Sequence, residues 1–287
     1  MKTIIKGIRT SLGLSQQEFA DLIGVTFAAV NRWENGHAMP NSMAQSRIYD
    51  VCAEREVPLI DLILNKIRNA VSQISPKEGR MILYHGSKSG IIGDIAPISR
   101  DHCDFGRGFY MGTQPEQPLT LICDFEKSKF YVVSLDLQSL NVFRVPADIE
   151  WAMLVAYHRG KMERIQGSPL YNRYQDMLRN RDVVIGSIAN DRMFYVLDNF
   201  FLGNITDTAL VKSLSALQLG EQVVCITQNA CNAVRIEKEI PISALERRCL
   251  QNINAENRAR GISLANDICR THRREGKYFD EILDGLD

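Results

Sequence analysis

Two short motifs contain the residue types that could do chemistry. A His-Gly-Ser run at residues 85–87 follows an apolar run at residues 81–84, and an Asp-Phe-Gly-Arg-Gly-Phe-Tyr run occupies residues 104–110. Short apolar runs bounded by Gly and Ser are typical of strands that enter tight turns. If two such strands lie side by side, His85 can face Tyr110 across a glycine-lined cleft. The pattern therefore predicts a small-molecule site.

Length and composition limit the classes of protein that can carry these motifs. A chain of 287 residues with 45% hydrophobic and 24% charged residues fits about two soluble globular domains. No apolar run approaches the roughly 18 residues of a membrane span, and the first residues lack a signal peptide's pattern. We therefore expect a cytoplasmic protein.

The cysteines and the net charge add two further expectations. Seven cysteines, with no close Cys-x-x-Cys pair, fit reduced thiols better than a disulfide framework. We assign no metal site to them. The formal net charge is zero, so contact with nucleic acid would have to come from local patches.

The first part of the chain has the apolar spacing of consecutive short helices. Ser15 and Glu18 have the spacing of a capping box, which predicts that a helix begins there. Gly24 permits a sharp turn, and Thr26 can cap the helix that follows. The pattern predicts a helix, a short turn containing Gly, and a second helix.

This segment, LSQQEFADLIGVTFAAVNRWENGHAMPN at residues 14–41, resembles the lambda-repressor-like (Xre-type) helix-turn-helix family. The resemblance implies a DNA-binding domain over residues 1–74, with residues 26–34 in the major groove. Trp33 and Glu34 are expected to serve structure, in helix packing and in a local ion pair or cap. The residues expected to approach DNA are Gln16, Gln17, Thr26, Phe27, Ala28, Asn31 and Arg32.

The charge of this segment predicts weak binding by a monomer. Residues 1 to 70 hold eight Lys and Arg against seven Asp and Glu, a net charge of +1, so little phosphate charge is neutralised. A homodimer or a protein partner would let two half-sites act together. The alternative is that these helices are only a docking module.

A multi-domain fold follows from the change of pattern after a linker at residues 75–80. The all-α helix-turn-helix domain is followed by an α+β domain at residues 81–241 and a helical tail at residues 242–287. We predict strands at residues 81–84, 109–111, 130–135, 183–187 and 222–227. We predict helices at residues 115–125, 147–159, 168–180, 191–201 and 206–218.

The motifs at residues 83–87 and 105–110 resemble the ADP-ribosyltransferase superfamily, in the branch of diphtheria toxin and the poly(ADP-ribose) polymerases. Residues 182–186 and 189–192 resemble, more weakly, a group of bacterial transferase-like domains of unknown function. The resemblance covers about residues 80–236 and implies that NAD is a co-substrate. The implied NAD-binding residues are His85, Gly86, Ser87, Arg107, Gly108 and Tyr110.

The chemistry explains why these residue types would be needed. Cleaving the bond between nicotinamide and ribose develops positive charge on the ribose, so an enzyme must hold the leaving ring still and stabilise an oxocarbenium-like centre. His85 can hydrogen-bond a ribose hydroxyl, and Gly86 lets its backbone approach the nicotinamide amide. Tyr110 offers a flat face to nicotinamide. For Arg107, contact with pyrophosphate and a place on a solvated loop are equally open.

The same resemblance implies a third element on a later strand, normally a glutamate that grips the ribose hydroxyl. The candidate strand is GEQVVCI at residues 220–226. Because successive residues point to opposite faces, only one of Glu221 and Gln222 can face the cleft. We favour Gln222. A neutral amide there offers no charge to a developing cation, which disfavours polymer synthesis and leaves transfer of single ADP-ribose groups.

A polar cluster formed by Asn190, Asp191 and Arg192 follows a predicted strand. These residues are read either as acceptor-side or phosphate-side groups or as a helix cap. Asp191 could supply a base for the acceptor.

Together the motifs predict an NAD-dependent mono-ADP-ribosyltransferase fused to a DNA-binding domain, of a bacterial toxin-antitoxin or phage-defence locus. An antitoxin protein is then a candidate partner, and the acceptor is a protein or a nucleic acid. One alternative is a transcriptional regulator whose second domain senses NAD without catalysis. Another is an RNA 2′-phosphotransferase, whose additional basic residues have no clear counterpart in this sequence.

Overall fold

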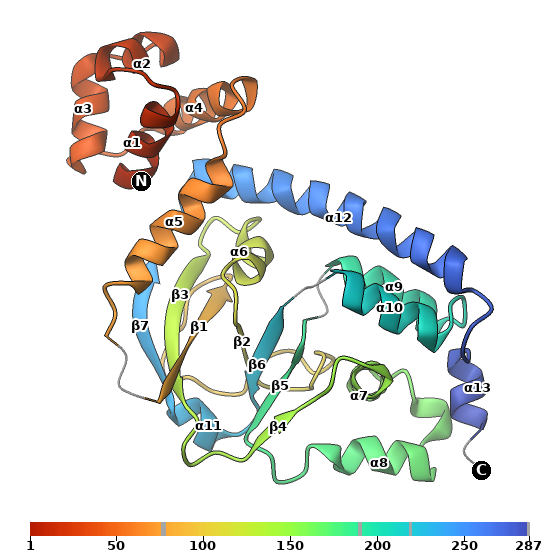
Figure 1. Cartoon of the computed structure of the whole chain (residues 1–287). Helices are drawn as coiled ribbons and strands as arrows, with labels where there is room; N and C mark the ends of the chain where they lie inside the picture. Colours follow the sequence, from red (N-terminus) through yellow and green to blue (C-terminus); the bar gives the residue numbers. More distant parts are fainter. Residues whose placement is uncertain (76–78, 189–190, 218–219, 286–287) are drawn as a thin grey trace.

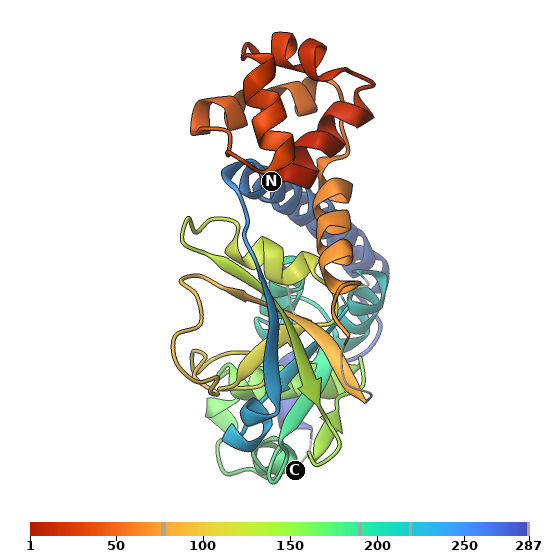
Figure 2. The same ribbon diagram turned by 90° about the vertical axis from the view of Figure 1, so that its left-hand side faces the viewer.

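The computed structural model describes residues 1–75, 79–188, 191–217 and 220–285. Within these ranges, an N-terminal module of helices stands at one end of the molecule, and a seven-stranded mixed sheet with its covering helices forms the rest, as Figures 1 and 2 show. The linker predicted at residues 75–80 falls in part on residues 76–78, which lie outside the described residues. No helix of the described residues is long and apolar enough to cross a membrane.

The N-terminal module follows the sequence signals closely. The predicted capping box is confirmed, because Ser15 Oγ accepts from the Glu18 amide at 3.2 Å and Glu18 Oε2 accepts from the Ser15 amide at 2.7 Å. Gly24 ends the second helix at a φ of +72°, and Thr26 caps the third. The module's helices are α1 (Lys2–Ser11), α2 (Gln16–Ile23), α3 (Phe27–Asn35), α4 (Ser42–Glu54) and α5 (Leu59–Val71).

The sheet has the strand order β4-β5-β6-β2-β1-β3-β7. The pair β4–β5 is parallel, and the other neighbouring pairs are antiparallel. The central strands β1 and β2 carry the two opening motifs. The strands are β1 (Arg80–Ser87), β2 (Phe109–Gly112), β3 (Lys129–Asp136), β4 (Val142–Arg144), β5 (Val183–Ser187), β6 (Glu221–Cys225) and β7 (Val234–Ile240).

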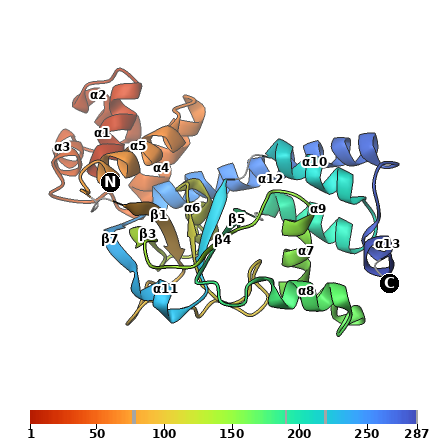
Figure 3. The same cartoon turned by 60° about the horizontal axis from the view of Figure 1, so that its bottom comes forward.

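Helices cover one face of this sheet, which we call the helix-covered face (Figures 1 and 3). There Tyr84 packs with α6 and α12, while Val184 and Val224 pack with α7, α9 and α10. The helices that follow the N-terminal module, with α11 on the opposite face, are α6 (Glu116–Ile122), α7 (Ile149–His158), α8 (Pro169–Met177), α9 (Asp191–Phe201), α10 (Asp207–Leu217), α11 (Gln228–Asn232), α12 (Ala244–His272) and α13 (Phe279–Asp284), with a 3-10 turn at Glu163–Ile165.

The opposite face, which we call the loop-covered face, holds the alternate residues of the same strands. Leu83, Met111 and Val223 belong to its core, together with Ala230 and Cys231 of α11. The loop of residues 88–108 between β1 and β2 packs Ile91 and Ile95 onto it. The two faces thus differ in cover: a layer of helices on one, a short helix and a long loop on the other.

The predicted helical tail is confirmed as helix but is not a separate unit. Helix α12 begins in a Ser243–Glu246 capping box and runs from the N-terminal module along the helix-covered side of the sheet (Figure 1). Its residues Leu245 and Cys249 share one core with Val51 of α4 and Leu119 of α6. The N-terminal module and the sheet domain are therefore joined by a continuous apolar core.

Gly86 is essential for packing α6 against β1. A Cβ at this position would lie 2.5 Å from the Pro118 carbonyl oxygen and 2.8 Å from Ile122 Cγ2. We expect Gly86→Ala to lower the free energy of unfolding by about 2 kcal/mol, because the helix must move away from the strand. Urea denaturation followed by circular dichroism measures this change; an unaltered midpoint would contradict the packing described here.

Candidate functional site

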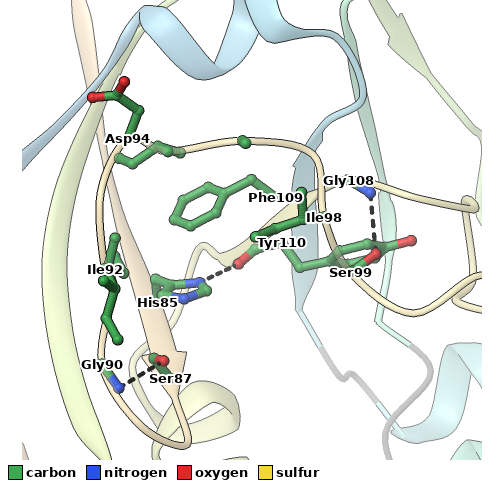
Figure 4. A pocket seen from close by; sticks show the side chains of 13 residues that line it. His85, Ser87, Gly90, Ile92, Asp94, Ile98, Ser99, Gly108, Phe109 and Tyr110 are labelled. Carbon is green, nitrogen blue, oxygen red and sulfur yellow. Dashed lines mark hydrogen bonds between the residues drawn. The ribbon is translucent and has the colours of Figure 1, made fainter.

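A cavity of about 250 Å³ lies on the loop-covered face between β1, β2 and the loop of residues 88–108 (Figure 4). Its wall is mostly apolar and includes Ile91, Ile95 and Phe109, with His85 at its base. A few polar side chains in an apolar concave wall are the usual composition of a small-molecule site. None of the described residues of α12 or α13 lines this cavity.

His85 reaches the cavity because β1 and β2 separate beside it. These strands are in register at a single residue pair, Tyr84 with Gly112, whereas β2 pairs along its whole length with β6. The Tyr110 carbonyl faces the gap and lies 2.7 Å from His85 Nδ1. Since a carbonyl oxygen can only accept, Nδ1 must carry the proton. The ring is thereby fixed between the strands (Figure 4).

The same hydrogen bond determines the chemistry of the other ring nitrogen. In a neutral imidazole with its proton on Nδ1, Nε2 is a hydrogen-bond acceptor. Burial lowers the pKa of His85 below its usual value, although the bond to Tyr110 opposes this shift. His85 is therefore neutral near pH 7 and presents an acceptor suited to a hydroxyl group.

The titration of His85 provides a test that needs no ligand. In ¹⁵N spectra of histidine-labelled protein, we expect His85 to be the Nδ1–H tautomer at neutral pH and to protonate below the usual pKa of a histidine. Because the folded-state pKa is lowered, stability contributed by this group is present above the unfolded pKa and is lost as the pH falls below about 6.5. An Nε2–H tautomer at His85 would contradict this assignment.

The aromatic face beside His85 belongs to Phe109 and not to Tyr110, contrary to the sequence prediction. The Phe109 ring stacks on the His85 ring with centroids 4.3 Å apart and an interplanar angle of 25°. The Tyr110 ring lies on the helix-covered face, where its hydroxyl donates to the Gly106 carbonyl at 2.8 Å. Only the backbone of Tyr110 serves His85. Phe109 was missed because Phe109 and Tyr110 are neighbours in one motif, and the motif alone does not show which of the two rings faces His85.

The structure reverses the expected order of Glu221 and Gln222. Gln222 is opposite Gly112, which is opposite Tyr84, so the Gln222 side chain lies on the helix-covered face, away from His85. It is 5% exposed and donates to Asp104 Oδ2 at 2.9 Å. Glu221 lies on the face that His85 occupies, is exposed, and pairs with Arg144 at 3.2 Å. Neither residue lines the cavity.

The remaining residues predicted for NAD divide into two groups. Ser87 and Gly108 line the cavity, and the Gly108 amide donates to Ser99 Oγ at 3.1 Å. Gly86 faces α6 and is absent from the lining. Arg107 is exposed and paired with Asp101, so its side chain occupies the solvated-loop position that the sequence left open. Four of the six residues predicted to bind NAD therefore line the cavity: His85, Ser87, Gly108 and Tyr110.

The predicted acceptor-side cluster is described only in part. Asn190 lies outside the described residues. Asp191 and Arg192 begin helix α9, but their side chains lie outside the described part of the structure. A role for these three residues remains a prediction.

The N-terminal module presents the exposed face of α3 to solvent. Phe27 is 47% exposed, and Ala28 and Arg32 are exposed beside it. Thr26 is confirmed as the cap of α3, since its Oγ1 accepts from the Ala29 amide at 3.2 Å. Gln17 is exposed and donates to Asp21 at 2.8 Å. These residues form a surface at the N-terminal part of α3 that is free of contacts with the sheet domain (Figure 2).

Glu34 organises the inner side of this surface. It is 5% exposed and accepts from Arg9 at 2.7 and 3.1 Å, which confirms the predicted ion pair. Gln16 also donates to Glu34 at 2.7 Å and accepts from Asn31 at 3.2 Å. Gln16 therefore joins α2 to α3 and orients Asn31. Trp33 is buried in the helix packing, as predicted.

Comparison with known families assigns both parts of the chain. Residues 5–43 match the helix-turn-helix family, so the N-terminal module is a helix-turn-helix DNA-binding domain. Residues 81–236 match the family described as "Protein of unknown function (DUF3990)". This match spans more than half of the chain, and the protein belongs to the DUF3990 family. No curated protein and no solved structure matched the chain.

Proposed function

We propose that this DNA-binding protein is an NAD-dependent mono-ADP-ribosyltransferase whose substrate site is the His85 cavity. One observation carries the proposal: the Tyr110 carbonyl holds His85 in the tautomer whose Nε2 accepts a hydrogen bond inside an apolar pocket. A ribose hydroxyl is the donor that such an acceptor needs, and the stacked Phe109 ring is a flat surface for the nicotinamide.

The size and lining of the cavity fit one end of NAD. At about 250 Å³ it is slightly below the range of about 300–1,000 Å³ that small-molecule pockets occupy. The nicotinamide and its ribose would fill it, and the pyrophosphate and adenosine would extend past the loop. No Lys or Arg is among the described residues that line the cavity, which favours this orientation over one with the pyrophosphate inside.

The reaction that follows is substitution at the ribose C1′. The bond from C1′ to the nicotinamide nitrogen breaks and the electron pair leaves with nicotinamide, while the acceptor nucleophile bonds to C1′ and loses its proton. An acceptor nitrogen at His85 Nε2 fixes the ribose as charge develops. Glu221 lies on the same face of the sheet but outside the cavity wall, so we assign it to the acceptor and not to the developing cation.

Two isotopic labels in one experiment test the proposal. Full-length protein is incubated with NAD labelled in nicotinamide or in the adenylate group, with and without cell extract. The proposal predicts released nicotinamide and adenylate label joined to protein, RNA or DNA. If neither label moves in any incubation, the transferase proposal fails.

The alternative is a DNA-binding regulator that senses NAD without catalysis. Its support is that Glu221, the one carboxylate of β6, does not line the cavity. Calorimetric binding of NAD by a protein that releases no nicotinamide would establish this alternative. A toxin-antitoxin or phage-defence role, with an antitoxin partner, remains a proposal that depends on transfer.

DNA binding is expected to be weak, salt-dependent and centred on α3. Replacing the exposed Arg32 by Ala should weaken binding to a labelled mixed-sequence duplex and lower the slope of log K against log salt by about 1, because one phosphate contact is lost. Arg179→Ala in the sheet domain is the matched control and should leave both values unchanged. Fluorescence anisotropy across a salt series measures them; equal effects from the two variants would exclude α3 as the contact.

A further inference from the structure

A buried polar cluster lies behind the candidate site, on the helix-covered face. Asp104 is 8% exposed, and its two carboxylate oxygens have different partners. Gln222 Nε2 donates to Oδ2 at 2.9 Å, and Arg159 donates to Oδ1 at 2.5 Å. Gln222 Nε2 also donates to the Ser187 carbonyl at 3.0 Å. The cluster thus joins the loop, β5, β6 and the residue that follows α7.

Asp104 is the first residue of the glycine turn at residues 104–108, whose last residue, Gly108, lines the cavity. The next residue, Phe105, donates its amide to the Tyr110 hydroxyl at 3.0 Å, and that hydroxyl donates to the Gly106 carbonyl at 2.8 Å. The Tyr110 ring is therefore fastened to the turn on one face of the sheet. Its carbonyl holds the His85 ring on the other side of the strand. A chain of direct contacts leads from Gln222 to His85.

The turn has little freedom to compensate if its anchor is lost. Gly106 has a φ of +75°, and a Cβ there would lie 2.9 Å from His158 Nδ1, so the turn is packed closely against α7. The Gly108 amide donates to Ser99 Oγ at 3.1 Å, which ties the turn to the part of the loop that lines the cavity. Loss of the anchor should therefore alter the turn, the Tyr110 carbonyl and the cavity wall together.

We infer that Gln222 and Asp104 are positioning residues, which act through the 104–108 turn and Tyr110 to set the orientation of His85. This inference rests on the proposed function of the His85 cavity. It explains why β6 has the amide of Gln222 at the position where the resemblance implies a glutamate. At this place a carboxylate would face Asp104 without a donor, so the amide is required to hold the turn.

Three variants separate positioning from the alternatives. Gln222→Leu removes the donor and leaves Asp104 Oδ2 without it; we expect kcat for nicotinamide release to fall about 10- to 100-fold, with a smaller change in KM. Gln222→Glu should lower kcat by as much. If Gln222 instead stood in for a catalytic acid, the Gln222→Glu variant would be more active than wild type. The exchange variant, Asp104→Asn with Gln222→Glu, keeps one amide and one carboxylate in contact and should recover part of the loss.

The histidine ¹⁵N spectrum supplies a readout that does not depend on turnover. In Gln222→Leu the Nδ1–H signal of His85 should shift or broaden, and the amides of Phe105 and Gly108 should exchange faster with solvent. Glu239→Gln, on the exposed edge strand β7, is the control and should change neither. If wild-type protein releases no nicotinamide, the proposed function fails while these spectra still test the positioning of His85.

Three results would overturn the inference. One is a His85 signal and amide exchange in Gln222→Leu that match wild type. Another is higher activity in Gln222→Glu than in wild type, which would make residue 222 a participant in the reaction. A variant that loses activity with an unchanged His85 signal would also contradict a route through the turn.

Discussion

Replacing His85 by Ala is expected to lower kcat/KM for nicotinamide release by about 100-fold or more. The side chain supplies the acceptor inside the cavity, and its Nδ1–H bond to the Tyr110 carbonyl fixes the direction of that acceptor. Removing one positioned hydrogen-bonding group that acts in the transition state costs about 10²- to 10³-fold. The measurement is steady-state release of labelled nicotinamide by purified protein.

Two companion variants show whether the loss comes from the acceptor. His85→Asn can keep a donor toward the Tyr110 carbonyl but has no atom at the Nε2 position, so it should be folded and as inactive as His85→Ala. His102→Ala is the matched control, because His102 is exposed and does not line the cavity. If both His85 variants release nicotinamide at the wild-type rate, the His85 cavity is not the site of the reaction.

Replacing Lys66 by Met is expected to have the largest effect on stability. Lys66 Nζ donates to Glu246 Oε1 at 2.7 Å and to the Pro241 carbonyl at 2.6 Å, where Glu246 is fully buried. This contact joins α5 of the DNA-binding domain to the start of α12. Without Lys66 the buried Glu246 carboxylate keeps, among the described residues, only the Ser243 amide and hydroxyl of its capping box as donors. Breaking a buried ion pair by removing one partner costs about 3–5 kcal/mol. We expect the midpoint of urea unfolding to fall accordingly.

The exposed pair on the sheet edge is the control for this change. Lys129 and Glu239 are 3.1 Å apart, and both side chains are nearly half exposed, so Lys129→Met should cost less than about 1 kcal/mol. If Lys66→Met and Lys129→Met shift the midpoint equally, the Lys66–Glu246 contact does not join the two parts of the chain in solution.

Local signals explain how much of the fold the sequence predicts. The Ser15 capping box, Gly24 and the Thr26 cap each act within a few residues, and all three are confirmed. The five predicted strands are present with end points that differ by a few residues. Two strands, β4 and β7, were missed. Three-residue β4 is too short to show a pattern.

Strand β7 was missed for a different physical reason. A bulge between Val132 and Val133 of β3 shifts the register of β7, so that Val133 is opposite Ile236 and Val132 is opposite Lys238. The shift breaks the two-residue period by which an amphipathic strand is recognised. Ile236 is left 45% exposed on the edge strand. In VRIEKEI, Lys238 interrupts the alternate apolar positions, and the bulge places Val234 on one face of the sheet and Ile240 on the other.

The sequence predicts which residues belong to the site, but it does not predict which of their side chains lie on the same face of the sheet as His85. His85 could be found because its motif is local. Whether Phe109 or Tyr110 faces it, and whether Glu221 or Gln222 does, depends on one long-range pairing, Tyr84 with Gly112. A change of one residue in that register would exchange the faces of all four. Asp104 was missed because its partners, Gln222 and Arg159, are distant in sequence.

The most direct test of this account is a crystal structure of the full-length protein with NAD. It should place a hydroxyl of the nicotinamide ribose within about 2.6–3.2 Å of His85 Nε2, with the nicotinamide against Phe109 and Nδ1 still bonded to the Tyr110 carbonyl. NAD bound elsewhere, or a His85 ring turned so that Nε2 meets that carbonyl, would contradict it.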